Sequence, residues 1–344
     1  MTASTDGVGA RYAGIDVSKD HLEVAVCGGD GALAGAPYRL PNTTAGLQAL
    51  REALERAAPR LVAVEATGAY HLPLVRALAA AQLPVAVVNP ARVKAFRQRR
   101  LERNKTDRQD ARLLARFAGL HAPELVPYTP PPAEQEELRH LLAYRDAVSR
   151  WRTVLLNQRE ANQWAGAPTA AGFVAQDLAQ VEARLRALDD EIQSVLGRLP
   201  EARVLRTLKG AGPLVAAAVL AYLPVAVWGR PKAAAACAGV HPAIAASGRT
   251  ERSRLSKTGC SRLRRYLYCG ALSARQWDPE LRAFYERLLA RGKPKKVAVV
   301  AVMHKLLRRL MGRLRTFRDG PRPDERARAQ GPTASTALAP AVAA

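Results

Sequence analysis

The chain has 344 residues, 48% of them hydrophobic, and carries 53 lysines and arginines against 30 aspartates and glutamates, a net charge of +23. This composition is typical of a globular protein of about two domains and excludes a collagen-like or wholly disordered chain. The charge predicts a large polyanionic partner, most often nucleic acid. An anionic membrane would require a basic amphipathic helix, a lipidation signal or a long apolar stretch, and we find none of these in the sequence.

The start of the sequence lacks the apolar stretch of a signal peptide, so we expect a cytoplasmic protein. The four cysteines, Cys27, Cys237, Cys260 and Cys269, have neither zinc-site nor disulfide spacing. We therefore expect reduced thiols and no structural metal of the zinc type.

Residues 1–130 alternate strand and helix patterns. "YAGIDVS", "HLEVAVCG" and "ALAGAPYRL" predict three strands joined by tight turns, and "TTAGLQALREALERA" predicts a helix with a threonine cap. "LVAVEATG", "HLPLVRALAAAQ" and "PVAVVNP" then predict strand, helix and strand. This order is typical of the α/β ribonuclease-H-like or RuvC-like fold, a mixed sheet with helices packed on it. In that fold the first and fourth strands lie side by side.

Residues 131–200 contain two long stretches of helical periodicity. In the second, apolar residues follow 3-4 spacing, which predicts a coiled-coil arm or a helical hairpin: Leu178, Val181, Leu185, Leu188, Ile192 and Leu196. Ordinary packed helices of a bundle are the alternative.

Residues 201–318 are predicted to form a mainly helical domain. It opens with "VLRTLKGAGPLVAAAVLAYL", a pattern of helix, glycine turn and helix that resembles a helix-hairpin-helix element. In such an element Gly210 and Gly212, next to Lys209, let backbone amides approach a phosphate at a helix N-terminus, although any corner between two helices uses similar glycines. Residues 319–344 have little to bury and are predicted to be a disordered tail.

Four acids fall at informative places. Asp16 ends the first predicted strand, Glu65 ends the fourth, and Asp107 and Asp110 open a helix within the basic stretch "RNKTDRQDARLLARFAG". Residues three apart share a helix face, so all four carboxylates can meet at one edge of the sheet. Carboxylates that meet repel unless a cation lies between them, and oxygen ligands favour Mg²⁺ or Mn²⁺. The surrounding bases, Lys105 and Arg108 among them, would bind the nucleic-acid backbone.

Each acid also has a plain structural explanation. Asp16 suits a turn after a strand, and Glu65 suits a solvated sheet edge. Asp107 in the first turn of a helix capped by Thr106 favours the helix dipole. The combination of an Asp and a Glu at two strand ends with D-x-x-D nevertheless favours a metal site over four separate structural roles.

The second basic stretch, "AASGRTERSRLSKTGCSRLRRYLY", contains a serine in a small-residue turn. Its arginines and lysine, with two tyrosines directly after them, suit phosphate binding and base stacking: Arg249, Arg252, Arg254, Lys257, Arg262, Arg264 and Arg265. The hydroxyl of Ser247 could attack a phosphodiester whose charge the guanidinium groups stabilise. From the residues alone, Ser253, Ser256 and Ser261 are equal candidates, and a plain turn role for Ser247 stays open.

Together these segments resemble the IS110 (IS-one-ten) family of insertion-sequence transposases. The elements that carry the resemblance are "GIDVSK", "VEATGAY", "NKTDRQDARLLA", "LKGAGPLVAAAVLA" and "AGVHPAIAASGRTERSRLSKTGCSRLRRYL", and they extend from about Tyr12 to about Arg315. The single serine of "AASG" and the "VHP" before it depart mildly from the usual pattern of the family.

The resemblance implies a DNA transposase that excises and inserts its own element, in the cytoplasm of a prokaryote and associated with the nucleoid. Asp16, Glu65, Asp107 and Asp110 would be the DEDD set that binds Mg²⁺, and Ser247 would form a transient 5′-phosphoserine link to DNA. It further implies a site composed from two subunits, a tetramer joined through the coiled-coil arms, and a non-coding bridge RNA that pairs with donor and target DNA.

Two other functions are compatible with the residues. A RuvC-like junction nuclease would use the four acids and not the serine. A non-catalytic protein that binds RNA or DNA would show salt-dependent binding and no strand transfer. The presence of both an acid set and a serine segment favours the recombinase, because a binding protein needs neither.

Overall fold

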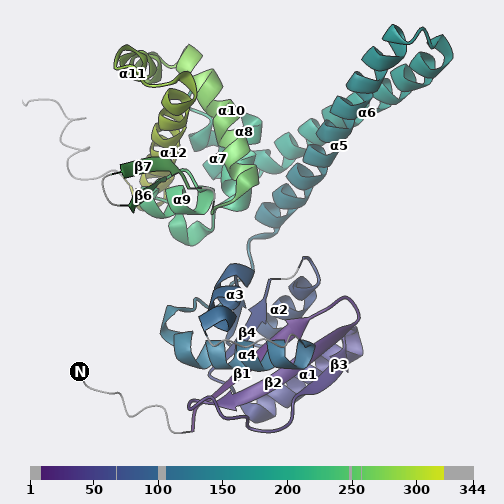
Figure 1. The fold of residues 1–344 in the computed structure, drawn as a ribbon, viewed down its shortest axis with the longest axis vertical. Coiled ribbons are helices and arrows are strands. Elements are labelled where there is room, and N and C mark those ends of the chain that lie inside the picture. Colours follow the sequence, from purple (N-terminus) through teal and green to yellow (C-terminus); the bar gives the residue numbers. More distant parts are fainter. Residues whose placement is uncertain (1–8, 67, 100–105, 248–249, 257, 321–344) are drawn as a thin grey trace, which may run out of the picture. The chain divides into compact units, whose positions relative to one another are not determined.

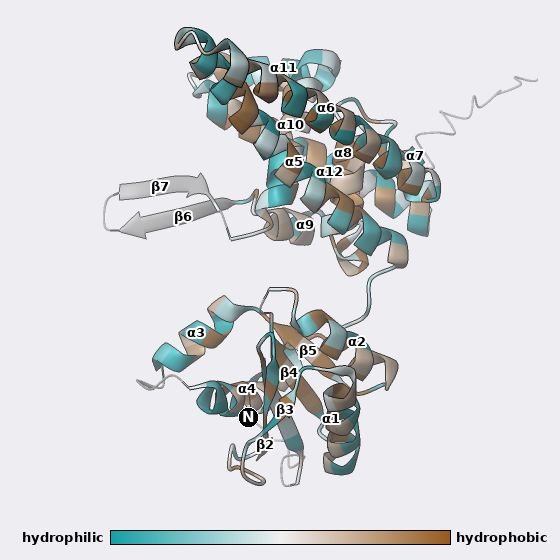
Figure 2. Ribbon diagram, turned by 90° about the vertical axis from the view of Figure 1, so that its right-hand side faces the viewer, coloured by the Kyte–Doolittle hydropathy of each residue, from teal (hydrophilic) through white to brown (hydrophobic). Residues whose placement is uncertain are grey.

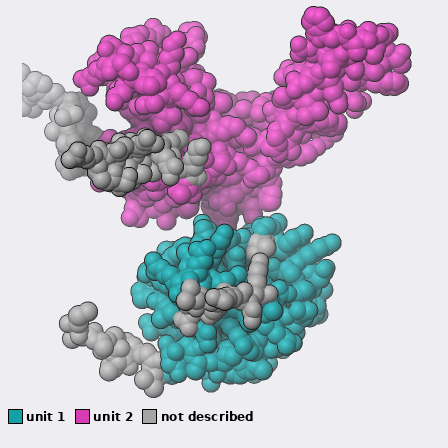
Figure 3. All heavy atoms as spheres, viewed as in Figure 1, with its two compact units in different colours: residues 1–130 teal, residues 131–344 magenta. Residues whose placement is uncertain are grey.

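The computed structural model describes residues 9–66, 68–99, 106–247, 250–256 and 258–320. The chain divides into two compact units, residues 1–130 and 131–344 (Figure 3). The predicted helical segment 131–200 and the predicted domain 201–318 lie in the same unit, so the boundary between them stays a prediction. The predicted tail lies outside the described residues beyond Gly320.

The first unit is built on a five-stranded sheet with the strand order β3-β2-β1-β4-β5 (Figure 1). Its strands are β1 (Arg11–Val17), β2 (His21–Gly28), β3 (Tyr38–Pro41), β4 (Leu61–Glu65) and β5 (Val85–Val88). Strand β2 is antiparallel to β1 and β3, whereas β4 is parallel to β1 and to β5. This is the ribonuclease-H-like topology that the sequence predicts, and it confirms that the first and fourth strands are neighbours. The third strand is shorter than predicted and shifted by one residue, since β3 contains Tyr38–Pro41 and the earlier Leu33 forms an isolated bridge with Cys27.

Helices cover both faces of this sheet. Helices α1 (Thr44–Ala57) and α2 (His71–Ala80) bury leucines such as Leu50 and Leu74 against one face. Helix α4 (Asp107–His121) lies on the other face, after α3 (Pro90–Arg99) and before a single 3-10 turn, Ala122–Glu124. Apolar side chains therefore gather along the central strands, as the colouring of Figure 2 shows.

The second unit begins with two long antiparallel helices, α5 (Ala133–Trp164) and α6 (Pro168–Gly197), which form a helical hairpin (Figure 1). Near the tip the two helices pack only on each other, through residues such as Val148, Leu155 and Val181. Near the base, Leu138 and Ile192 join the main core of the unit. The tip of this helix pair thus corresponds to the predicted arm, and its base corresponds to the alternative of helices packed in a bundle.

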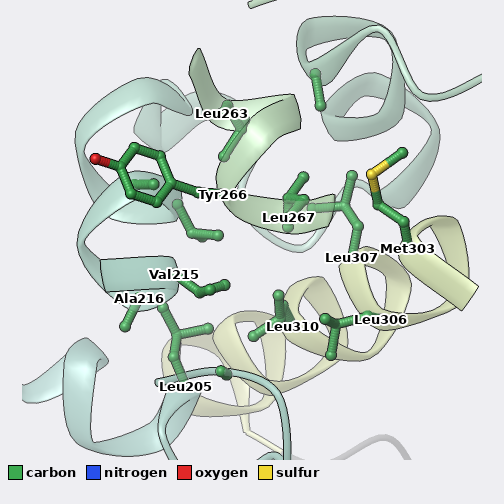
Figure 4. Packing of buried hydrophobic residues seen from close by; sticks show 14 of the residues in the cluster. Leu205, Val215, Ala216, Leu263, Tyr266, Leu267, Met303, Leu306, Leu307 and Leu310 are labelled. Atoms are coloured by element: carbon green, nitrogen blue, oxygen red, sulfur yellow. The ribbon is translucent and has the colours of Figure 1, made fainter. Parts of the chain in front are cut away.

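That main core is helical. It contains α7 (Pro200–Leu205), α8 (Pro213–Tyr222), α9 (Pro231–Ala238), α10 (Ser261–Trp277), α11 (Pro279–Ala290) and α12 (Lys295–Asp319), with a 3-10 turn at Val225–Val227. Leu263 and Leu267 of α10 pack against Leu306 and Leu310 of α12, with Val215 of α8 beside them (Figure 4). The predicted order of short helix, glycine turn and second helix is present as α7, residues 206–212 and α8.

One prediction for this unit is wrong. Residues 242–255, predicted as a basic loop inside a helical domain, form the antiparallel strands β6 (Pro242–Ser247) and β7 (Thr250–Leu255). The register pairs Ser247 with Thr250 and leaves a Gly-X dipeptide between them, a composition that two-residue hairpin connections favour. The small residues of "PAIAAS" hide this strand, because their alternation between apolar and polar is weak.

Among the described residues, no helix is both long enough and apolar enough to span a membrane.

Candidate functional site

Two of the predicted site acids come from neighbouring parallel strands. Asp16 lies near the end of β1, and Glu65 is the last residue of β4. The register pairs Ile15 with Val64, so Asp16 and Glu65 follow as the next pair along the two strands. The carboxyl ends of parallel strands meet at one sheet edge, and this edge therefore carries both acids.

The other two acids come from α4, which lies directly on β1. Thr106 caps this helix, because its hydroxyl accepts a hydrogen bond from the amide of Gln109 at 3.3 Å. Gly14 permits a very close approach: a Cβ there would lie 2.1 Å from the amide nitrogen of Ala115. This contact fixes the first turn of α4, with Asp107 and Asp110, near the end of β1 that carries Asp16.

The pKa of Asp16 shows that the other three acids lie close enough to act on its carboxyl group. Burial, and after it the charges of Asp110, Asp107 and Glu65 in that order, together raise the pKa of Asp16 to about 6. Acids from β4 and from α4 thus act on the same carboxyl group. The role of these four residues as a metal site stays a prediction.

A fifth acid, Glu23, belongs to this site and was missed by the sequence reasoning. It lies on β2 directly opposite Asp16, and its exposed fraction is 0%. Arg39 of β3 donates from Nε to its Oε1 at 2.5 Å, while Oε2 is buried without a hydrogen-bond partner in the described part of the chain. The available signal was the alternation of "HLEVAVCG", which assigns Glu23 to the face that carries Asp16.

Basic side chains contact the two acids of α4. Nε2 of His21 lies 3.4 Å and Nη2 of Arg39 lies 3.7 Å from Oδ2 of Asp107. Arg97 of α3 donates from Nη2 to Oδ1 of Asp110 at 2.5 Å, and both side chains are largely buried. These three basic residues were also absent from the predicted site, since a sequence cannot indicate which of many arginines reaches an acid.

In the described part of the chain, the acids contact basic side chains and do not form a compact metal site. Within the described ranges, no three His, Cys, Asp or Glu side chains gather closely enough to hold an ion together. The donor chemistry still suits a hard cation, because every predicted ligand is a carboxylate and because like charges raise the pKa of Asp16. A bound cation would replace Arg97 and Arg39 as the positive partners of Asp110 and Asp107.

The predicted serine, Ser247, is the last residue of β6, and Arg252 and Arg254 lie in β7. Arg249, Lys257 and, in the first unit, Lys105 lie outside the described residues. Of the other candidate serines, Ser253 is in β7, Ser256 is buried with its hydroxyl 2.8 Å from that of Thr258, and Ser261 begins α10. Ser256, buried and paired with Thr258, is less available than the exposed Ser261.

The base of the hairpin is anchored by close backbone packing. Gly239 has φ +64°. A Cβ on Gly259 would lie 2.2 Å from the amide nitrogen of Gly239. The amide of Cys260 donates to the carbonyl of Cys237 at 2.7 Å, and Arg264 donates to the carbonyl of Ala238 at 3.1 Å. Arg264, a predicted nucleic-acid contact, therefore helps to hold the start of α10 against the turn that precedes the hairpin.

Arg262 and Arg265, also predicted nucleic-acid contacts, surround the buried Asp146 of α5. Arg265 forms an ion pair with it, Nε of Arg262 lies 4.0 Å from its Oδ2, and the hydroxyl of Tyr266 donates to its Oδ1 at 2.8 Å. Burial, followed by this hydrogen bond, raises the pKa of Tyr266. Both arginines remain about half exposed, so this structural role leaves part of each guanidinium open to solvent.

The glycine turn before α8 lines a hollow of about 530 Å³ in the second unit. Gly210 has φ +89° and packs against the backbone of Gly270, and Gly212 caps α8. Arg150 and Arg265 line the same hollow. Lys209 beside it, like Arg108 at the start of α4, is exposed. The predicted contacts Gly210, Gly212 and Arg265 are thus brought together in one place.

Comparisons with known proteins agree with both units. A DEDD transposase model of the IS110 family matches residues 13–162, and a model described as transposase IS116/IS110/IS902 family matches residues 202–286. The pilin gene-inverting proteins of Moraxella lacunata and Moraxella bovis are each 28% identical to the chain over 252 residues, which cover 71% of this chain and 76% of each relative.

Among solved structures, a Thermus thermophilus RuvC in complex with a Holliday junction substrate matches 35% of this chain and 99% of its own, with 19% identity and a TM-score of 0.28. A second Thermus thermophilus RuvC structure matches 34% of this chain and 99% of its own, with 20% identity and a TM-score of 0.27. The two family models, which describe the same family, together cover about two thirds of the sequence. The chain belongs to the IS110 family of transposases, and it is a DNA recombinase.

Proposed function

We propose that this recombinase excises and inserts its own DNA element, using a divalent cation at Asp16, Glu65, Asp107 and Asp110 and the hydroxyl of Ser247 as nucleophile. The observation that carries the metal part is the raised pKa of Asp16, to about 6, with three other carboxylates among its causes. Mg²⁺ or Mn²⁺ fits this all-oxygen donor set. When bound, such an ion would neutralise phosphate charge during strand transfer.

The chain's own residues have separable tasks in this proposal. The carboxylates of Asp16 and Glu65 are fixed by the sheet, and those of Asp107 and Asp110 by α4. Arg39, Arg97 and His21 offset the negative charge of the acids in the absence of a cation. Arg39, whose side chain is 53% exposed, would also be accessible to a DNA phosphate while it stays paired with Glu23.

The covalent step belongs to Ser247. Its oxygen would attack a DNA phosphorus, form a 5′-phosphoserine bond and release the 3′-oxygen of the broken strand, which takes up a proton. Attack of a different 3′-hydroxyl on the phosphoserine then restores the serine and joins the strands. The arginines of β7 and their neighbours would stabilise the added charge on the phosphate.

We further propose a bridge RNA as guide and a tetramer as the active assembly. A net charge of +23 suits a protein that binds RNA as well as DNA. The arm formed by α5 and α6 exposes large apolar side chains near its tip, with Trp164 86% and Phe173 66% exposed, and such residues favour contact between subunits. The names of the Moraxella relatives support inversion of a DNA segment as a further possible outcome of the same reaction.

The deciding experiment measures junction formation in cells that carry the gene with its native flanking DNA. Wild type is expected to form circular or inserted junctions, whereas Ser247→Ala and Asp107→Ala form none. Ser253→Ala in β7 and Asp20→Ala at an exposed site serve as matched controls and should remain active. If only Asp107→Ala fails, the serine is incidental and a RuvC-like junction nuclease becomes the better description. If wild type binds DNA but never forms junctions, the chain is a binding protein.

A further inference from the structure

A second hollow of the helical unit is lined by two arginines, a lysine and a histidine, with a proline and an alanine between them. It has a volume of about 680 Å³ and lies between the start of α9 and the middle of α12. Its lining residues are Arg230, Pro231, Lys232, Ala233, His304 and Arg308. We call these the basic hollow. None of them belongs to the sheet edge with Asp16, Glu65 and the start of α4, which we call the acid edge. None belongs to the β6–β7 hairpin that ends β6 at Ser247, which we call the serine hairpin, or to the glycine turn before α8.

The fold places these side chains together for local reasons. Gly229 has φ +75°, and a Cβ there would lie 2.9 Å from Cβ of Arg315, so the turn before α9 runs directly against α12. Helix α9 then starts at Pro231, beside α12 (Figure 1). His304 and Arg308 are four residues apart on α12 and so share one helix face. The arrangement of the hollow is therefore fixed by backbone packing.

The charge of the hollow is not compensated. In the described parts of the chain, no acidic side chain forms an ion pair with Arg230, Lys232 or Arg308, and no acid lines the hollow. The next residue of α12 is different: Arg309 lies 2.8 Å from Asp278 and 3.5 Å from Glu280. Helix α12 thus carries one arginine with a structural partner and, beside it, one that faces an open basic cavity.

His304 adds a neutral polar group to the cations. Burial lowers the pKa of His304, and the nearby charge of Arg308 lowers it further. At neutral pH its imidazole therefore has one N–H to donate and adds no positive charge of its own. The first residues of α9 line the same hollow, and the N-terminus of a helix favours an anion.

We propose that the basic hollow binds the phosphodiester backbone of a nucleic acid, as a contact separate from the acid edge and the serine hairpin. This inference rests on the proposed action on DNA. Two arginines and a lysine suit the charge of adjacent phosphates. The hollow has no aromatic ring on which a base could stack, apart from the imidazole of His304, and its small residues are Pro231 and Ala233. It therefore positions the strand and does not read its sequence.

The test is the salt dependence of binding to a DNA duplex of unrelated sequence, measured with EDTA present so that no strand is cut. The variant Lys232→Gln/Arg308→Gln is compared with wild type and with Arg291→Gln/Lys293→Gln, which removes the same charge from exposed residues of the same unit. We expect the slope of log affinity against log salt to fall by about 0.9 for each lost phosphate contact, so by about 1 to 2 in total. The control should keep the wild-type slope. Arg308→Lys, which retains the charge, should keep it too.

Several outcomes would overturn the inference. Equal losses in the variant and the control would mean that net charge alone acts, and an unchanged slope in the variant would remove the contact. If inorganic phosphate binds wild type tightly, and the variant loses this binding while its DNA slope stays unchanged, the hollow serves a free phosphate compound. Failure of the proposed function looks different, because wild type itself would then bind DNA without forming junctions.

Discussion

The acid edge of the first unit and the basic hollow of the second are both clusters of like charge, but the fold treats them differently. At the acid edge, Arg39 and Arg97 contact Glu23, Asp107 and Asp110, while burial and then the repulsion from neighbouring acids raise the pKa of Asp16. In the basic hollow, no acid of the described chain lies among the lining residues. One cluster is partly neutralised by the protein, whereas the other depends on solvent and ligands.

This difference indicates how each cluster gains a ligand. A cation that enters the acid edge must compete with arginines already in place, so its binding is coupled to their movement. A phosphate that enters the basic hollow displaces no acid and relieves repulsion directly. The basic hollow is therefore open to an anionic ligand as it stands. At the acid edge, a cation and the arginines would be alternative partners of the same carboxylates.

The largest effect is expected where the acid edge depends on packing. Gly14→Ala would place a Cβ 2.1 Å from the backbone of α4, which must shift. We expect a loss of about 3 kcal/mol in the free energy of unfolding, together with loss of junction formation, because Asp107 and Asp110 move with α4. Urea unfolding and the junction assay measure the two effects. Gly172→Ala on α6 is the control, since nothing lies within 4 Å of that position. A Gly14→Ala variant with unchanged stability and activity would contradict the placement of α4.

A smaller effect is expected from the arginine that compensates Glu23. Arg39→Ala leaves a carboxylate of 0% exposed fraction without its partner, which should cost about 2 kcal/mol of unfolding free energy. The double variant Arg39→Ala/Glu23→Gln removes the stranded charge and should recover most of this loss. Arg51→Ala, whose partner Glu55 is exposed on the same helix, should cost only about 0.3 kcal/mol. Equal losses at Arg39 and Arg51 would show that Glu23 does not depend on Arg39.

Much of the acid edge could be predicted from the sequence, because its signals are local. Strand alternation followed by helix and strand patterns indicated the order of the sheet, and hence the pairing of Asp16 with Glu65. A threonine cap before D-x-x-D indicated the start of α4. These features depend on residues within a few positions of each other, which is the range over which periodicity and capping rules apply.

The partners of the acids could not be predicted, because they depend on tertiary contacts. Arg97 is 13 residues from Asp110, and Arg39 is 16 residues from Glu23, in a chain with 53 basic residues. The same limit applies to Arg264 and Arg265, whose sequence context resembles a phosphate-binding loop although both contact protein groups. The hairpin of β6 and β7 was missed because the sequence of β6, "PAIAAS", alternates only weakly between apolar and polar residues.

The pH dependence of stability tests the raised pKa of Asp16 at the acid edge. Asp16 has a pKa of about 6 in the folded protein against an ordinary value of 3.8, so the folded state holds its proton over a range in which the unfolded chain has lost it. Stability of the metal-free protein should therefore fall as pH rises from about 4 to about 6. Asp16→Asn carries no such charge, so it should melt above wild type at pH 7.5 and close to wild type at pH 4. Thermal melts in EDTA measure this, with the exposed Asp20→Asn as control.

Addition of Mg²⁺ should reverse the difference at pH 7.5, because binding to the folded state stabilises wild type and not the variant that lacks a ligand. An Asp16→Asn variant less stable than wild type in EDTA at that pH would contradict the repulsion among the acids. Equal stabilisation of both proteins by Mg²⁺ would contradict the role of Asp16 as a ligand.

The smallest effect is expected in the basic hollow, where two adjacent arginines of α12 can be compared. Arg308→Gln relieves repulsion with Arg230 and Lys232, so we expect a gain of a few tenths of a kcal/mol at low salt that vanishes at high salt. Arg309→Gln should instead lose about 1 kcal/mol, because Asp278 is largely buried and also caps α11. Urea unfolding at two salt concentrations measures both. If Arg308→Gln destabilises the protein as Arg309→Gln does, Arg308 has a structural partner and the hollow is compensated like the acid edge.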